Sequence, residues 1–593
     1  MNNELKKRFI SFKIPFVISL ILTVSTSVIS GVVMGLFIPL ISMILDQKVA
    51  SNIPLLTPLM NHLETYPFDL VISLSLSIFA LICLKNIICY QTLKYSQKFQ
   101  LNLMSSIRSL TVKYLFQLPL AFVQKMQSGD LLLILNKHSG QTALMLEDIR
   151  LMIGSLFTVI LYLYLLLTLS VPFTLLSLMC MILFYFPSKY LYNRLNKLGD
   201  ISLVDARNVS VFGIEMTSGF RLIKESANEE TEMTRYDNIL ENFNRTQLDT
   251  GLARETNRIT TEILKVICIF ILIISAKLLS KKYNLPLDNA HLFAFLIIFH
   301  QAIGPLASII SQIGNFAIRI AGAKDLNLFL NKADGSLQQE GRQIFDKLHN
   351  TLSFDHVSFR YEDNLDDVLN DICFEIKKGK RIAFVGESGA GKSTLLNLLY
   401  GFNRPQHGRI SVDGVNLDKL NITSWRQKIA CVSQDTFLFN RTIRENITYG
   451  LPEYSEPDYL KAISVSGSQQ FINELPDKDN TVIGERGIRL SGGQAQRIAI
   501  ARAVIKKPEI LIFDEATSAL DSLTERQVQN ALDEVSSSFT TITIAHRLST
   551  IIKSDVIYVL NKGKIIEKGI HNDLLKINGS YAAMWKTQSE NTE

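Results

Sequence analysis

Six long apolar segments in the first half of the chain constrain its fold more than any other feature. A helix needs about 20 apolar residues to cross a bilayer. The segments of about that length or longer are Ile14–Leu45, Asp69–Lys94, Asp148–Leu169, Thr174–Tyr192, Ile259–Leu279 and Asp288–Ile318. The fourth is the weakest candidate, because Pro187 interrupts it. The hydrophobic share of 47% and the mean hydropathy of +0.19 are high for a soluble protein, so we predict an all-α membrane domain with six spanning helices.

Basic residues beside these segments predict their orientation. The clusters before the first span and after the second and fourth comprise Lys6, Lys7, Arg8, Lys13, Lys94, Lys98, Arg108, Lys113, Lys189, Arg194 and Lys197. The positive-inside rule places these regions and both chain ends in the cytoplasm, although Lys281 and Lys282 would then lie outside. The connections Tyr95–Glu147 and Asn193–Arg258 would also be cytoplasmic, and their length and periodicity predict helices that extend out of the membrane.

Charge and cysteine content limit the possible partners. The net charge of +6 is small for 593 residues and no concentrated basic face is evident, so we expect no nucleic-acid partner. The cysteines are Cys83, Cys89, Cys180, Cys268, Cys373 and Cys431. Four lie in apolar runs and none has a metal-ligand spacing such as C-x-x-C, so we expect buried, reduced thiols.

His300 and Gln301 form a polar pair near the middle of the sixth span, just before Gly304-Pro305. Polar side chains at that depth should face other helices or a wet cavity. Contact with a transported substrate and hydrogen bonding between helices both remain open for this pair.

A glycine-rich loop in the second half predicts a phosphate-binding site. The stretch RIAFVGESGAGKSTLLNLL reads as a strand, a loop and a helix start, and fits the pattern G-x-x-x-x-G-K-[ST]. In such a loop the backbone amides hold phosphates, Lys392 reaches the β- and γ-phosphates of ATP, and the Ser393 hydroxyl binds Mg²⁺. The predicted ATP-binding residues of this loop are Gly386, Glu387, Ser388, Gly389, Ala390, Gly391, Lys392, Ser393 and Thr394.

Two further strands end in polar side chains. In PEILIFDEATSALD the apolar run Ile510–Phe513 is followed by Asp514 and Glu515, at the strand end where α/β sheets bind nucleotides. Asp514 is suited to hold Mg²⁺ and Glu515 to act as general base on the attacking water. In TTITIAHRLST a strand ends at His546, which we expect to contact the γ-phosphate.

A second glycine-led helix start, RLSGGQAQRIAIAR, has the same anion-binding design as the first. Its segment LSGGQ, Leu490–Gln494, resembles the signature of ATP-binding cassette (ABC) transporters, which other P-loop families lack. Over essentially its whole length, the chain resembles an exporter-type half-transporter, with one membrane domain fused to one nucleotide-binding domain.

The resemblance assigns further roles to individual residues. Tyr361 in VSFRY matches the aromatic residue that stacks on adenine. Gln434 in CVSQD matches the glutamine that senses Mg²⁺ and the membrane domain, and Asp521 in SALD matches the D-loop aspartate. Segments Leu115–Leu132 and Val209–Glu230 resemble the two cytoplasmic coupling loops of exporters.

The resemblance also implies a dimer. In this family each ATP lies between the glycine-rich loop of one subunit and the signature of the other. Residues Ser491, Gly492, Gly493 and Gln494 would therefore meet the ATP of a second copy of the chain. A homodimer is expected, and a heterodimer is not excluded.

The expected function is ATP-driven export or flipping of an amphipathic or lipid-like substrate, such as a lipid, glycolipid, lipid-linked saccharide, peptide or drug. An importer of the same fold and an ATP-gated channel or regulator remain alternatives. ATP and Mg²⁺ are the expected small-molecule requirements.

The composition changes near Asn350 and divides the chain. We predict a membrane domain over residues 1–330, a linker over 331–349, and over 350–593 an α/β P-loop NTPase domain with an α-helical subdomain. The resemblance and the Lys-, Asn- and Ile-rich composition favour a multi-pass protein of a bacterial inner membrane, with its nucleotide-binding domain in the cytoplasm.

Overall fold

A computed structural model describes residues 2–45, 70–182, 185–283, 289–336, 341–361, 366–484, 487–514, 533–536, 539–545 and 547–590. The chain divides into two compact units. The membrane unit comprises Met1–Leu118 and Phe122–Leu337, and the nucleotide-binding unit comprises Gln338–Glu593 with Pro119–Ala121.

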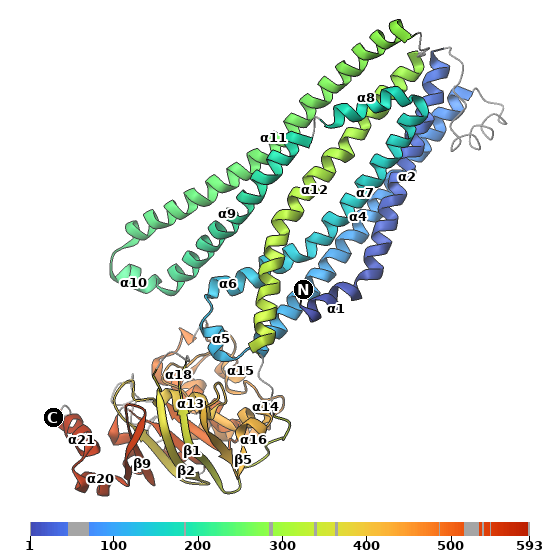
Figure 1. Cartoon of the computed structure of the whole chain (residues 1–593). Coiled ribbons are helices and arrows are strands. Elements are labelled where there is room, and N and C mark those ends of the chain that lie inside the picture. Colours follow the sequence, from blue (N-terminus) through green and yellow to red (C-terminus); the bar gives the residue numbers. More distant parts are fainter. Residues whose placement is uncertain are drawn as a thin grey trace. The chain divides into compact units, whose positions relative to one another are not determined.

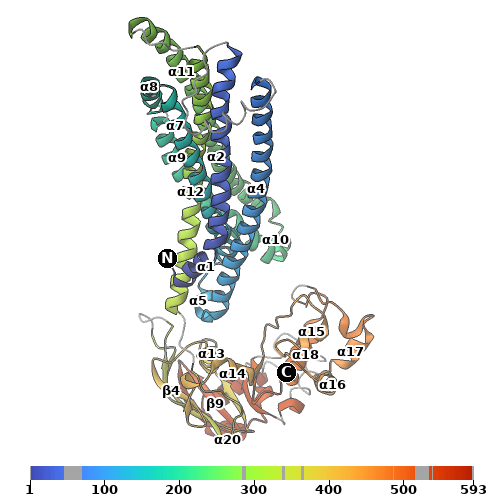
Figure 2. The ribbon, with the colours of Figure 1, turned by 90° about the vertical axis from the view of Figure 1, so that its right-hand side faces the viewer.

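The described part of the membrane unit is entirely helical (Figures 1 and 2). Its elements are α1 (Asn3–Ser11), α2 (Lys13–Ile44), α4 (Leu70–Gln117), α5 (Leu120–Gln124), α6 (Ser128–Leu133), the π-helix η1 (Ile134–His138), α7 (Ser139–Leu169), α8 (Val171–Ile182), α9 (Tyr185–Ser218), α10 (Phe220–Glu225), α11 (Glu229–Tyr283) and α12 (Asn289–Ser336). The long helices carry both the apolar segments and the polar connections between them, which confirms that these connections are helical.

Four helices within the described residues are long and apolar enough to cross a membrane. They are Lys13–Ile44, Leu70–Gln117, Gly129–Leu169 and Ala290–Ser336. The other two expected spans fall on α8, the start of α9 and the second half of α11. The count of six spans therefore stays a prediction.

Pro187 lies near the start of the described part of α9, Tyr185–Ser218. Residues 183 and 184 lie outside the described residues, so the interruption that Pro187 predicts in the fourth span stays a prediction.

Two hydrophobic clusters hold the membrane unit together. One joins α2, α4, α7, α8, α11 and α12 around fully buried residues such as Leu36, Leu166, Leu272 and Phe299. The other joins α1, α4, η1, α7 and the last turns of α12 around Leu103 and neighbouring buried side chains. This second cluster holds the helical extensions of the membrane unit together.

The nucleotide-binding unit contains two sheets. A four-stranded antiparallel sheet has the order β2-β1-β4-β5, and a six-stranded sheet has the order β10-β9-β3-β8-β7-β6. The strands are β1 (Thr351–Phe359), β2 (Leu369–Lys377), β3 (Arg381–Val385), β4 (His407–Val412), β5 (Val415–Asn416), β6 (Ile429–Val432), β7 (Ile510–Asp514), β8 (Thr540–Ile544), β9 (Val556–Asn561) and β10 (Lys564–Gly569). All neighbours in the larger sheet are parallel except β10 and β9.

Burial patterns explain which strands enter which sheet. In β3 the four residues Ile382–Val385 are all buried, as expected for a parallel strand that is covered on both faces. In β2 buried and exposed residues alternate, so that one face packs on the core and the other meets solvent.

Helices cover the larger sheet and form a helical subdomain beside it. They are α13 (Lys392–Leu399), η2 (Leu417–Lys419), α14 (Ile422–Gln427), α15 (Ile443–Ile447), α16 (Glu456–Val465), α17 (Gln469–Glu474), η3 (Lys478–Asn480), α18 (Gly492–Ile505), η5 (Leu548–Ile551), α20 (His571–Ile577) and α21 (Ser580–Glu590). One apolar cluster joins α13 to both sheets. Another joins α15, α16, α17 and α18 to β6 and β7. The predicted fold class, a helical membrane domain followed by an α/β domain with a helical subdomain, is confirmed.

The expectation of buried cysteines is wrong for four of the six. All six are free, but Cys83, Cys89, Cys373 and Cys431 are exposed. Cys83 and Cys89 lie on α4, and an apolar run in a spanning helix does not say which face points outward. Cys373 lies between buried Ile372 and Phe374 on β2, so strand alternation turns it outward.

Candidate nucleotide-binding site

The glycine-rich loop joins β3 to α13, as the sequence predicts. Gly391 caps α13 with a left-handed φ of 103°, a conformation that side chains with a Cβ rarely adopt. A Cβ there would also meet the Leu369 side chain at 2.7 Å, and one at Gly386 would overlap the Leu560 carbonyl oxygen. The close packing of this loop therefore requires glycine at both positions.

Lys392 is the first residue of α13 and is buried. Its Nζ donates hydrogen bonds to the carbonyl oxygens of Gly386 at 2.7 Å and Glu387 at 2.9 Å. The ammonium group thus lies inside the curve of the loop, at the N-terminus of a helix, where positive charge favours an anion. Beyond it, Ser393 is exposed and Thr394 is buried.

Tyr361 lies against the same helix. Its hydroxyl is 3.1 Å from Thr394 Oγ1, and Asn397 Nδ2 donates to it at 3.4 Å. The ring packs edge-on against Phe359, and 45% of the residue is exposed. The structure therefore brings an accessible aromatic ring beside the phosphate-binding loop, although the two lie about thirty residues apart in the chain.

The sheet topology gathers the other predicted residues at one edge. Strands β3, β8, β7 and β6 are consecutive and parallel, so their carboxyl ends lie together. The loop follows β3, the half-buried Asp514 ends β7, and the exposed Gln434 follows β6 by two residues. Glu515, Asp521 and His546 lie outside the described residues.

The signature stretch Leu490–Gln494 begins α18 in a different way from that in which the glycine-rich loop begins α13. Ser491 is the N-cap, and its Oγ accepts from the Gln494 backbone N–H at 3.3 Å. Gln494 Oε1 accepts from the Ser491 N–H at 2.9 Å, which completes a capping box. Ser491 and Gly492 are exposed and Gly493 is buried. Since α18 and α13 belong to different apolar clusters, the two glycine-led helix starts occupy different parts of the unit.

Arg502 and Asn446 connect α18, the helix that the signature stretch begins, to the segment Phe437–Asn446. The sequence did not indicate this role. The Arg502 guanidinium donates to the Asn446 carbonyl oxygen at 2.8 Å, to Asn446 Oδ1 at 3.1 Å and to the Phe437 carbonyl oxygen at 2.9 Å. The fully buried Asn446 side chain also bonds with the backbone of Phe439 and Thr442. Burial lowers the pKa of Arg502 from its usual value. The segment that follows Gln434 is thus fastened to α18.

His300 and Gln301 lie in α12, and both are exposed in the single chain. The adjacent residue Ala302 is buried and lines a pocket of about 430 Å³. Apolar side chains of α7, α8 and α12, among them Leu166, Leu178 and Leu306, form its wall. This pocket includes neither member of the polar pair.

Two family models match the chain in the order of its two units. The model of the ABC transporter transmembrane region matches residues 14–306, and the ABC transporter model matches residues 369–518. Among its relatives, the heterocyst differentiation ATP-binding protein HepA of Nostoc is 33% identical over 495 residues, which cover 83% of this chain and 80% of the relative. An ATP-dependent lipid A-core flippase of Nitrosococcus oceani is 37% identical over 395 residues, covering 66% of this chain and 64% of the relative.

A solved structure agrees over nearly the full length. The structure of a bacterial Atm1-family ABC exporter with ATP bound superposes with a TM-score of 0.78 at 25% identity, and the match covers 99% of both chains.

A helical membrane unit fused to a P-loop unit defines a membrane transporter that is driven by ATP. The chain belongs to the ABC transporter family and has the layout of an exporter half-transporter. It is therefore an integral membrane protein that binds and hydrolyses ATP and couples hydrolysis to transport.

Proposed function

We propose that two copies of the chain form an exporter or flippase, in which two ATP molecules are bound between the nucleotide-binding units. The observation that carries this proposal is the separation of the two glycine-led helix starts. The start of α18 is exposed and is capped by its own side chains. Helix α18 also belongs to a different apolar cluster from α13, the helix that follows the glycine-rich loop. A complete ATP site then needs the phosphate loop of one copy and Ser491–Gln494 of the other.

The predicted residue roles are retained within this proposal. Tyr361 would stack on adenine, Gly386–Thr394 would hold the phosphates, and Glu515 and His546 would position and activate the attacking water. Asp521 would contribute at the interface between the two units. The predicted domain boundaries, with the membrane domain ending at residue 330 and the nucleotide-binding domain beginning at residue 350, likewise stay proposals.

A magnesium ion fits the donor set at the sheet edge. Ser393 offers an exposed hydroxyl, Gln434 an exposed amide oxygen and Asp514 a half-buried carboxylate, all hard oxygen ligands of the kind that Mg²⁺ prefers. Bound there, the ion would neutralise charge on the phosphates. The residues of this chain would hold the phosphates in line for attack by one positioned water molecule.

Closure of the two nucleotide-binding units would switch the membrane units between inward-facing and outward-facing states. ATP bound to both subunits favours the closed state, and hydrolysis by Glu515-activated water removes those shared contacts. The substrate class that we propose is amphipathic or lipid-like. It is supported by the lipid A-core flippase relative and by the apolar pocket of about 430 Å³ between the membrane helices. A bacterial inner membrane with both chain ends in the cytoplasm fits the charge pattern.

The variant Glu515→Gln tests the proposal. It should bind ATP and hold a closed dimer, while ATPase activity falls at least about a hundredfold, as is typical when a positioned general base is lost. Native mass measurement with ATP and a phosphate-release assay report the two quantities. Glu509→Gln, directly before β7 at its other end, is the matched control and should keep its activity, since its carboxylate accepts from the Leu348 N–H at 3.3 Å and pairs with Lys378 Nζ at 3.8 Å, away from the carboxyl ends of the strands. Full activity in Glu515→Gln would overturn the assignment of the base, and a strictly monomeric ATP-bound variant would overturn the dimer.

A further inference from the structure

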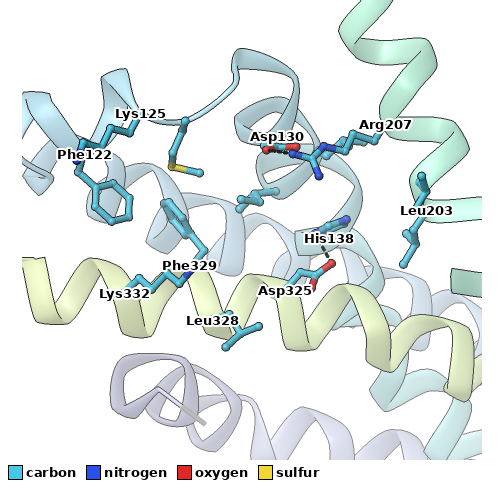
Figure 3. Close-up of a pocket in the computed structure, with 14 residues that line it drawn as sticks. Phe122, Lys125, Asp130, His138, Leu203, Arg207, Asp325, Leu328, Phe329 and Lys332 are labelled. Atoms are coloured by element: carbon cyan, nitrogen blue, oxygen red, sulfur yellow. Dashed lines mark hydrogen bonds and ion pairs between the residues drawn. The ribbon is translucent and has the colours of Figure 1, made fainter.

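A second pocket lies in the helical extensions of the membrane unit, apart from the nucleotide site (Figure 3). Its volume of about 540 Å³ falls within the range of roughly 300–1,000 Å³ that is usual for small-molecule sites. Side chains from α5, α6, η1, α9 and α12 line it. All of these elements belong to one compact unit, apart from residues of α5 that do not line the pocket.

The wall that faces α9 is held in place by specific contacts. Arg207 Nη2 of α9 pairs with Asp130 Oδ2 of α6 at 2.5 Å. Gly129 packs so closely on α9 that a Cβ would meet Val211 Cγ2 at 2.8 Å. The chain then passes through the π-helix η1, where Ser139 Oγ donates to the Ile134 carbonyl oxygen at 2.8 Å. Single π-turns within α-helices often occur at functional sites, and this one supplies two residues that line the pocket.

His138 at the end of η1 is the most unusual of the lining residues. It is 7% exposed, and among the described residues its Nδ1 has no hydrogen-bond partner. The nearest carboxylate oxygen, Asp325 Oδ2 of α12, is 3.9 Å away, which is ion-pair range but too far for a hydrogen bond. A buried polar atom without a hydrogen bond is destabilising, and because His138 lines the pocket, its imidazole is a polar group that a hydrogen-bonding group of a ligand can contact.

The charges that line the pocket are unequal and separated. Three side chains are cationic, Lys125, Arg207 and Lys332, whereas two are carboxylates. Both carboxylates already have a nitrogen within ion-pair distance. In Figure 3 the two lysines lie toward one end, and the Arg207–Asp130 and His138–Asp325 pairs lie toward the other. On α12 itself, Lys332 is two helical turns, about 10 Å, from Asp325.

Apolar side chains connect the two ends. Phe122, Met126, Ile134 and Phe329 are among them, and the two phenylalanines lie on the side of the lysines in Figure 3. A ligand that matches this surface has an anionic group at the lysine end, an apolar body and a polar group that reaches the imidazole.

We propose that this pocket binds a single-chain amphipathic anion whose carboxylate lies beside Lys125 and Lys332 and whose hydroxyl, at the far end of an apolar chain, hydrogen-bonds to His138. The bound molecule contacts α6, α9 and α12 together. The proposal goes beyond the transport function, since it concerns neither the ATP site nor the pocket between the membrane-spanning helices.

Photoaffinity labelling of the full-length protein in lipid nanodiscs tests this assignment. The probe is ω-hydroxylaurate that carries a diazirine in its chain, and mass spectrometry identifies the labelled peptides. Labelling is expected in the peptides that contain residues 122–138 and 325–332. Unlabelled ω-hydroxylaurate should compete best, while laurate and lauryl alcohol should each compete on the order of tenfold less well, since the first lacks the hydroxyl and the second the charge.

Three variants localise the effect. Lys332→Glu reverses the charge of an exposed lining residue and should reduce labelling on the order of tenfold. Leu328→Trp changes a lining residue that is 55% exposed and should block the pocket without disturbing the core. Lys324→Glu is the matched control, because Lys324 is exposed on the same helix and does not line the pocket.

The proposal stands if labelling of these peptides falls in Lys332→Glu and Leu328→Trp but not in Lys324→Glu. It is overturned if labelling is confined to membrane-spanning peptides or is unchanged in both pocket variants. Equal competition by lauryl alcohol and ω-hydroxylaurate would likewise overturn it.

Discussion

The two glycine-led helix starts, at α13 and α18, look alike in sequence but differ in how their backbone N–H groups are arranged. The start of α13 has no side-chain cap, a left-handed glycine and a lysine that is folded into the loop. The start of α18 carries a complete capping box, and its serine is exposed.

This difference shows how each can meet an anion. At α13 Lys392 and the loop backbone come from the same segment, so one chain can supply the phosphate-binding half of the proposed ATP site. At α18 the helix start is stabilised by its own serine and glutamine and is exposed, which supports our proposal that it meets an anion held by a second copy of the chain. The comparison is therefore between a start that encloses its own lysine and a start that offers an exposed contact surface.

Lys392→Ala should have the largest effect, because it removes the cation that the glycine-rich loop encloses at the start of α13. We expect ATP binding to weaken and ATPase activity to fall on the order of a hundredfold or more. Nucleotide-binding titration and phosphate release measure the two. Lys380→Ala is the control. Lys380 lies directly before β3, the strand that leads into the glycine-rich loop, and it pairs with Asp555 at 3.0 Å on the surface. Unchanged ATP affinity in Lys392→Ala would contradict the comparison.

Ser491→Arg should stop hydrolysis but leave ATP binding by the phosphate loop largely intact, because a bulky cation now covers the contact surface. Activity should again fall about a hundredfold, with ATP affinity changed by only a few-fold. Ser455→Arg is matched to it, because Ser455 is also an exposed N-cap that accepts from a backbone N–H, here Asp458 at 3.3 Å. If both variants lose activity equally, the effect comes from helix capping and not from a second subunit.

Asn446→Ala tests how much the hydrogen bonds of the Asn446 side chain contribute to holding α18 in place. A buried side chain with four hydrogen bonds is lost, which should destabilise the nucleotide-binding unit by about 2–4 kcal/mol. Thermal unfolding followed by fluorescence checks this, and hydrogen exchange should rise in α15 and α18. Asn421→Ala, which removes only the N-cap of α14 with its 2.9 Å bond to the Ser424 N–H, should cost about 1 kcal/mol. Equal losses would mean that the Asn446 network adds nothing beyond a cap.

Tyr361→Ala should have the smallest effect, on the α13 side alone. Loss of a stacking ring is worth about 1–3 kcal/mol, so the KM for ATP should rise several-fold or more while maximal turnover changes little. Tyr361→Phe keeps the ring and loses only the contacts of the hydroxyl, 3.1 Å to Thr394 Oγ1 and 3.4 Å to Asn397 Nδ2, and its KM should stay close to that of the unaltered protein. A similar rise in both variants would assign the effect to the hydroxyl.

Features that depend on neighbours in the sequence could be predicted well. The strand, loop and helix around Gly386–Ser393 follow from one continuous stretch, and the structure has β3 and α13 there. The long helices of the membrane unit follow from apolar runs that continue into polar ones with helical periodicity. The roles of Glu515, Asp521 and His546 stay predictions, since these residues lie outside the described part of the chain.

Features that depend on distant partners could not be predicted. Asn446 and Arg502 are separated by 56 positions, and neither belongs to a motif that would have singled it out. The exposed Cys373 came together with His356 and Asp371 across β1 and β2, within 4.8 Å, because strand pairing and not sequence spacing sets that distance. The position of His138, whose Nδ1 has no hydrogen-bond partner among the described residues, depends on a π-turn that no local residue pattern indicated.

The uninterrupted course of α11 has a mechanical consequence. Its 55 residues form one helix from Glu229 to Tyr283, about 80 Å long at 1.5 Å per residue. A rod of that length acts as a lever arm, because a tilt of about 5° at one end displaces the other by roughly 7 Å, more than one helical pitch of 5.4 Å. A small rotation at one end of α11 can therefore produce a large displacement at the other end, because the helix is continuous from Glu229 to Tyr283.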